Sequence, residues 1–152
     1  HGLRIAVVKH AHHSFQMDMP GKDSHRLRSA GADETLVAGR CRIGWVKECK
    51  DRDEEPRLHE VLAVLDPTNL DLVLVEGFKR EPFPKIELYR PALGRPLLFP
   101  TDRNIVAIAS DGHLARDPLD LPQLPLNEPA AIAAFILDFI GRGAQQRAGR
   151  AC

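Results

Sequence analysis

The sequence is organised around residues 70–77, which read Leu70-Asp71-Leu72-Val73-Leu74-Val75-Glu76-Gly77. Five of the first six residues are apolar, and the run is too short to cross a membrane. A continuous apolar run of this length predicts a strand that is buried on both faces inside a parallel sheet. Ligands of open α/β sheets bind beyond the carboxyl ends of central strands. We therefore expect Glu76, a carboxylate that needs a partner such as a metal ion, to face a ligand.

Further segments with strand or helix patterns flank this run. Apolar or alternating stretches predict strands over residues 3–8, 35–38, 42–48, 85–89 and 104–109. Gly39-Arg40 predicts a hairpin, and Leu124 and Leu126 would add a short edge strand. Periodic apolar residues predict helices from Ser24 to Ala30, from Pro56 to a stop at Pro67, and from Asn127 to a stop at Gly141 and Gly143.

The alternation of strands and helices predicts an α/β fold. The sheet is expected to be mainly parallel with helices on both faces, and the segments 42–49 and 85–89 leave a mixed sheet open. Neither an internal repeat nor an interdomain linker is visible. Residues 1–143 are therefore expected to form a single domain, and residues 144–152 a flexible tail.

Charge and cysteine content narrow the function classes. The formal net charge is zero, and residues 1–50 are basic while residues 51–152 are acidic. This balance argues against general nucleic-acid coating and permits a local anion site. The three cysteines, Cys41, Cys49 and Cys152, form no Cys-x-x-Cys pair. An odd number of cysteines favours reduced thiols in a cytosolic protein, and no apolar run is long enough for a membrane span.

Polar side chains stand at the ends of three predicted strands: Lys9-His10, Glu76-Gly77 and Ser110-Asp111. If these strands are parallel, the three clusters share one edge of the sheet. A lysine beside carboxylates suits a nucleotide phosphate with Mg²⁺. The alternative is that these groups are polar strand ends that meet solvent.

Two other groups of residues could bind ligands. Asp23 opens a predicted helix, where it would serve equally as a plain N-cap or as part of an anion or metal site. Arg26 and Arg28 are two positions apart, so at most one of them is expected to reach the same ligand. The histidines form a weak zinc pattern that lacks a fourth ligand, and contact with phosphate or a partner is the favoured reading. They are His10, His12, His13 and His25.

Several motifs, in order, resemble the MobB family of molybdopterin-guanine dinucleotide biosynthesis adaptors. They are Val8-Lys9-His10-Ala11-His12-His13, Pro20-Gly21-Lys22-Asp23-Ser24 with Arg26-Leu27-Arg28, Asp71 to Lys79, Lys85 to Arg90, and Ile105 to Asp111. The resemblance runs from about residue 2 to about residue 140. It implies a P-loop NTPase-like α/β fold in a cytoplasmic, usually dimeric protein.

The resemblance also implies a function. Family membership implies binding of GTP with Mg²⁺ and at most weak hydrolysis, with no catalytic residue visible in this sequence. The implied partners are the guanylyltransferase that attaches GMP to molybdopterin, and the molybdoenzymes or their chaperones. No nucleic-acid or membrane partner is expected.

The family pattern carries over to individual residues. Glu76 and Asp23 match the positions that help to hold Mg²⁺, and Lys9, with His10 beside it, matches the position near the phosphates. Asp111 is a candidate for contact with the base. These roles come from the resemblance and not from residue spacing.

One departure from the family pattern opens an alternative function. Members of the family begin with a strand, a Walker A loop and a helix, and this chain begins roughly where that helix ends. As given, the fold is thus expected to be N-terminally incomplete, with weak GTP affinity and an unpaired gap in the sheet. The alternative function is therefore a pure protein-protein adaptor that binds no nucleotide.

Overall fold

The computed structural model describes residues 2–11, 15–50, 54–114 and 121–148. The chain divides into two compact units, His1–Phe78 and Lys79–Cys152, and each is described by itself. No helix in the described ranges is long and apolar enough to cross a membrane.

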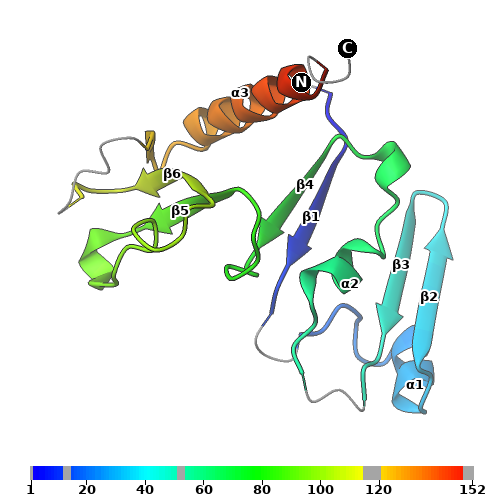
Figure 1. Cartoon of the computed structure of the whole chain (residues 1–152). Helices are drawn as coiled ribbons and strands as arrows, with labels where there is room; N and C mark the ends of the chain where they lie inside the picture. The colour runs from blue at the N-terminus through cyan, green and yellow to red at the C-terminus, as the bar shows by residue number, and fades with distance from the viewer. Residues whose placement is uncertain (1, 12–14, 51–53, 115–120, 149–152) are drawn as a thin grey trace. The chain divides into compact units, whose positions relative to one another are not determined.

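The first unit is built on a parallel pair of strands. Strand β1 (Ile5–Lys9) pairs with β4 (Leu72–Glu76), so that each residue from Ile5 to Lys9 lies opposite one from Leu72 to Glu76. Figure 1 shows the two strands side by side and pointing the same way. Their carboxyl ends therefore coincide.

An antiparallel hairpin completes the strands of the first unit. It consists of β2 (Glu34–Gly39) and β3 (Arg42–Lys47), as the Gly39-Arg40 turn signal predicted. Helix α1 (Asp23–Ser29) precedes the hairpin and packs against β2. Gly31, with φ of +114°, ends the helix. Its N–H donates a hydrogen bond to the Arg28 carbonyl, and the N–H of Ala32 donates to the Leu27 carbonyl. These two hydrogen bonds form a Schellman motif, so the predicted helix stop at Gly31 is confirmed.

The second helix is shorter than the sequence predicted. Helix α2 spans Leu58–Leu62 rather than starting at Pro56, because Arg57 is extended and acts as its N-cap. The N-cap of α1 is likewise Lys22, where Asp23 or Ser24 was expected, and Asp23 is the first helical residue. A 3₁₀ turn, η1 (Pro67–Asn69), leads into β4.

The second unit holds a fully parallel sheet in the order β5 (Lys85–Tyr89), β6 (Ile105–Ser110) and β7 (Gln123–Pro125). A second 3₁₀ turn, η2 (Pro91–Leu93), follows β5. The parallel pairing of β5 with β6 means that residues 85–89 do not make this sheet mixed. Antiparallel pairing among the described strands is confined to the β2–β3 hairpin.

The expectation that residues 70–77 form a strand buried on both faces is wrong. β4 is half-buried, and Leu74 is 36% exposed, because among the described strands β4 pairs with β1 alone. The strand that is buried is β6, flanked on both sides, in which Ala107, Ile108 and Ala109 have no exposed surface. A continuous apolar run thus marked a sheet strand correctly but did not tell which strand is central.

Helix α3 (Pro129–Ala148) follows β7 and packs against it. Proline suits its first position, where the missing N–H has no intrahelical acceptor. The helix continues through Gly141 and Gly143, which were expected to end it. Glycine inside a helix costs only about 1 kcal/mol relative to alanine, and the Asp138–Arg142 ion pair one turn apart supports the helix here.

A cross-strand ion pair holds the amino ends of β1 and β4 together. The Arg4 guanidinium and backbone N–H both donate to the Asp71 carboxylate, with the Nη2 to Oδ1 distance at 3.0 Å. Hydrogen bonding to Arg4 lowers the pKa of Asp71 to about 2. An ionised Asp71 therefore stabilises the fold above its ordinary pKa near 4, and this contribution is lost as the pH falls through about 2.

We expect Asp71→Asn to lower the free energy of unfolding at pH 7, and to lower it much less near pH 2. Urea unfolding of the variant and the wild type at several pH values measures the difference. Asp23→Asn, which alters a carboxylate that is 96% exposed, is the control. A difference that is the same at every pH would show that Asp71 does not act through its charge.

Candidate functional site

Two of the predicted site residues meet at the carboxyl ends of β1 and β4. Lys9 and Glu76 are the last pair in the parallel register, and Lys9 Nζ lies 3.3 Å from a Glu76 carboxylate oxygen. Both side chains are about two-thirds exposed, at 67% and 68%. An ammonium and a carboxylate therefore stand side by side at the edge of the sheet where ligands of α/β proteins bind.

His10 lies next to this pair, and its side chain is largely covered. Its backbone N–H donates to the Glu76 carbonyl at 2.9 Å. The imidazole, 11% exposed, stacks on Phe78 with ring centroids 4.4 Å apart, and its Nε2 lies 2.8 Å from a Glu55 carboxylate oxygen. The structure thus gives His10 the role of fixing the strand end, and what it offers a ligand beyond that stays a prediction.

The turn after Glu76 is conformationally special. Gly77 has φ of +93°, and a Cβ on it would lie 2.6 Å from the His10 Cβ. Phe78 follows with φ of +49°, the one positive φ among the described residues other than glycine. A left-handed conformation costs an L-residue roughly 1 kcal/mol. The stack of Phe78 on His10 accompanies this conformation, and the backbone angle and the close approach of His10 together require glycine at position 77.

Asp23 is exposed at the start of α1. It is the first residue of α1, its side chain is 96% exposed, and a carboxylate oxygen lies 3.9 Å from the Arg26 guanidinium. No three His, Cys, Asp or Glu side chains in the described ranges are grouped to hold a metal ion. A site that binds Mg²⁺ through one or two carboxylates, phosphates and waters does not need such a group.

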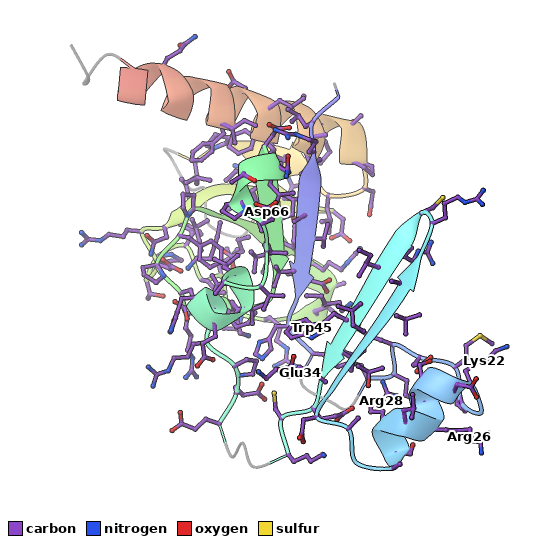
Figure 2. All side chains as sticks on the ribbon, turned by 90° about the vertical axis from the view of Figure 1, so that its right-hand side faces the viewer. Lys22, Arg26, Arg28, Glu34, Trp45 and Asp66 are labelled. Atoms are coloured by element: carbon purple, nitrogen blue, oxygen red, sulfur yellow. The ribbon has the colours of Figure 1, made fainter. Side chains whose placement is uncertain are left out.

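The two arginines of α1 diverge, as their spacing predicted. Arg28 is 15% exposed and pairs with Glu48 at 3.2 Å, whereas Arg26 is 76% exposed. Figure 2 shows them on different sides of the helix. Arg28 therefore ties α1 to the residue that follows β3, and Arg26 is the one open to a ligand.

The remaining histidines and cysteines add no further site that the structure describes. His12 and His13 lie outside the described residues, and His25 lies within α1. Cys41 and Cys49 are free, exposed thiols. The zinc reading thus gains no support from the described side chains.

In the second unit, Asp111 follows the end of β6. Its carboxylate forms an ion pair with Arg90, the residue directly after β5. The sequence singled out Asp111 but missed Arg90, and no local signal in the sequence marks a pair 21 positions apart. Asp111 would have to share its carboxylate with Arg90 in order to contact a base.

An apolar hollow in the first unit is a poorer candidate for a polar ligand. It has a volume of about 290 Å³. Its lining residues are Leu62, Leu65, Pro67 and Leu70 to Val73. The one charged group there is Asp71, which Arg4 already holds. The strand end at Lys9 and Glu76 therefore remains the better site.

Comparison with known proteins points to one family. Residues 1–111 match the family model MobB, described as molybdopterin guanine dinucleotide synthesis protein B. A molybdopterin-guanine dinucleotide biosynthesis adapter protein of Escherichia coli is 41% identical over 140 residues, which cover 91% of this chain and 78% of the relative. The protein of the same name from Haemophilus influenzae is 36% identical over 138 residues, 91% of this chain and 74% of the relative.

Solved structures agree with the sequence relatives. The MobB crystal structure from Bacillus subtilis has a TM-score of 0.65 and 26% identity, and the alignment covers 89% of this chain and 79% of that one. A MobB homologue from Bacillus stearothermophilus has a TM-score of 0.62 and 27% identity, with 93% and 80% covered. The expected P-loop NTPase-like α/β fold is thereby confirmed.

We expect Gly77→Ala to destabilise the protein more than Gly31→Ala. Both glycines have a positive φ, so both variants bear a backbone cost of about 1 kcal/mol. Only at Gly77 does the added methyl collide, with His10, while at Gly31 nothing lies within 4 Å. Urea unfolding of the two variants measures the excess, and equal losses would contradict the close contact between Gly77 and His10.

Proposed function

Because the chain belongs to the MobB family, we propose that it acts in molybdopterin guanine dinucleotide synthesis as an adapter that binds GTP together with Mg²⁺. The adapter role in this pathway is supported by the relatives in Escherichia coli and Haemophilus influenzae, which are molybdopterin-guanine dinucleotide biosynthesis adapter proteins. The observation that supports a nucleotide site is the exposed Lys9–Glu76 pair at the carboxyl ends of two parallel strands. The Glu76 carboxylate suits the metal ion of a nucleotide bound with Mg²⁺, and the Lys9 ammonium suits a phosphate of that nucleotide.

The roles of the two side chains follow from their chemistry. Glu76 would hold Mg²⁺, since carboxylate oxygens are its preferred protein ligands. Lys9 would contact a phosphate as a point charge. The ion pair keeps the two groups together before the ligand arrives, so their positions are set by the β1–β4 register. Bound Mg²⁺ would neutralise part of the phosphate charge.

The other predicted residues enter the proposal less directly. Asp23 would support the metal from the start of α1, and His10 would hold the strand end on which Lys9 and Glu76 stand. Contact of Asp111 with the base stays a prediction from the family resemblance. Hydrolysis is proposed to be weak, because Lys9 and Glu76 are both assigned to binding and neither is free to activate water.

The partners and the compartment are also proposals. The adapter would act on the guanylyltransferase that attaches GMP to molybdopterin, and on molybdoenzymes or their chaperones. Free thiols at Cys41 and Cys49 support a cytoplasmic location. The family resemblance further supports a homodimer.

We expect Glu76→Gln to weaken Mg²⁺-dependent GTP binding by about tenfold or more, and to leave binding without Mg²⁺ little changed. Calorimetry on a form of the protein that carries a Walker A segment measures both affinities. Asp71→Asn is the matched control, since it removes the ion pair at the opposite end of the same two strands. Unchanged Mg²⁺ dependence in Glu76→Gln would remove Glu76 from the site.

A second candidate function is an adapter that binds its partner without nucleotide. The description of the relatives as adapter proteins supports it, because an adapter needs only a protein partner. If this function is correct, the immobilised chain retains the guanylyltransferase equally well with and without GTP. Strict dependence of this capture on GTP would favour the nucleotide-binding function instead.

A further inference from the structure

A glutamate that precedes α2 contacts the histidine behind the candidate site. Glu55 lies in the segment between β3 and α2, and its Oε2 is 2.8 Å from the Nε2 of His10. The Glu55 side chain is 61% exposed, whereas the His10 side chain is 11% exposed. Glu55 therefore reaches from the surface of the first unit to a ring that is largely covered.

This contact sets where a hydrogen of the imidazole lies. An ionised carboxylate has hydrogen-bond acceptors and no donor, so the Nε2 of His10 must carry a hydrogen and donate it to Glu55. The same ring stacks on Phe78, with the ring centroids 4.4 Å apart. The orientation of the imidazole is thus fixed by a hydrogen bond at its edge and by a stack on its face.

The backbone around Glu55 has little freedom. Pro56 follows it, and a residue that precedes proline is restricted to extended backbone. Arg57 is the N-cap of α2, and its N–H donates to the Glu60 carboxylate at 3.0 Å. Leu58, the first helical residue, is 7% exposed and belongs to the core. Glu55 therefore stands three positions ahead of a buried residue, at the start of a capped helix.

His10 transmits this constraint to the candidate site. Side chains alternate along a strand, so His10 and Lys9 project to opposite faces of the β1–β4 pair. The backbone N–H of His10 donates to the Glu76 carbonyl at 2.9 Å, and the His10 Cβ approaches Gly77 so closely that no Cβ fits there. The imidazole therefore supports, from behind, the strand ends that carry Lys9 and Glu76.

We propose that Glu55 is a positioning residue of the nucleotide site. By accepting the hydrogen bond from His10, it holds the ends of β1 and β4 where Lys9 meets a phosphate and Glu76 meets Mg²⁺. The inference rests on the proposed GTP-binding function, and Glu55 acts through His10 without touching the ligand. The side chains of Lys9 and Glu76 are both about two-thirds exposed, so their positions depend on the strand ends.

The test is a titration of the full chain with GTP in the presence of Mg²⁺, followed by ¹H–¹⁵N NMR, which measures weak affinities as well as strong ones. We expect Glu55→Ala to raise the dissociation constant at least about tenfold, the usual effect of removing a group that orients a metal ligand. Glu55→Gln should restore the affinity to nearly that of the wild type, because its amide oxygen still accepts a hydrogen bond from Nε2.

The imidazole signals in the same spectra provide a second measurement. We expect the Nε2–H of His10 to be visible in the wild type and in Glu55→Gln, because it is hydrogen-bonded and largely covered. In Glu55→Ala the signal should be lost through exchange with water. A general loosening of the fold would not tie the loss of affinity to the loss of this one signal.

Asp33→Ala is the matched control. Asp33 precedes β2, its side chain is 82% exposed, and it pairs with Lys50 at 2.9 Å. The substitution therefore removes an exposed carboxylate and an ion pair of similar length from the same unit. It should leave both the GTP affinity and the His10 signal as they are in the wild type.

Three results would overturn the proposal, and they separate it from the proposed function. Wild-type affinity in Glu55→Ala would show that Glu55 does not position the site, while GTP binding would stand. Equal losses of affinity in Glu55→Ala and Glu55→Gln would show that the charge of Glu55 matters and its hydrogen bond to His10 does not. A wild type that does not bind GTP with Mg²⁺ would remove the proposed function, and the positioning role with it.

Discussion

The parallel pairing of β1 with β4 is the constraint on which the candidate site depends. Lys9 and Glu76 are 67 positions apart in the sequence, and it is the register of the two strands that places them 3.3 Å apart. The His10 N–H extends the ladder by one bond to the Glu76 carbonyl, and the stack of His10 on Phe78 then closes the turn. Strand pairing, turn geometry and site chemistry are thus successive consequences of one alignment.

Local patterns in the sequence predicted the elements of the fold well. The hairpin around Gly39-Arg40, the helix stop at Gly31 and the apolar strand β6 all rest on short-range chemistry, namely turn residues and periodicity. The burial of each strand was harder to predict. An apolar run indicates that a strand can be buried, but it does not indicate which strands lie beside it. The run at residues 70–77 therefore pointed to a doubly covered strand, while the structure covers β6 instead. The predicted helix stop at Gly141 and Gly143 was wrong because the other residues of α3 outweigh the weak helix propensity of these two glycines.

The residues of the candidate site likewise divide into those that the sequence could pair and those that it could not. Lys9 and Glu76 could be paired from the sequence because each ends a predicted strand, and parallel strands end at a common edge. The partners Glu55 and Arg90 could not, because each lies in a segment without periodic signal and meets its partner only through the tertiary fold. The sequence therefore identifies residues that regular structure brings together, and it misses those that loops supply.

The two ion pairs that bracket β1 and β4 resolve an ambiguity that apolar patterning leaves open. Alternation of side chains has a period of two, so a slip of two residues would keep every side chain on its original face. Ile5 would then meet Leu74 instead of Leu72, an equally apolar neighbour. The same slip would separate Lys9 from Glu76 and Arg4 from Asp71. Both ion pairs would then be broken, and four charged side chains would lose their partners. Charge at the two ends thus selects one alignment from a set that hydrophobicity alone would treat as equivalent.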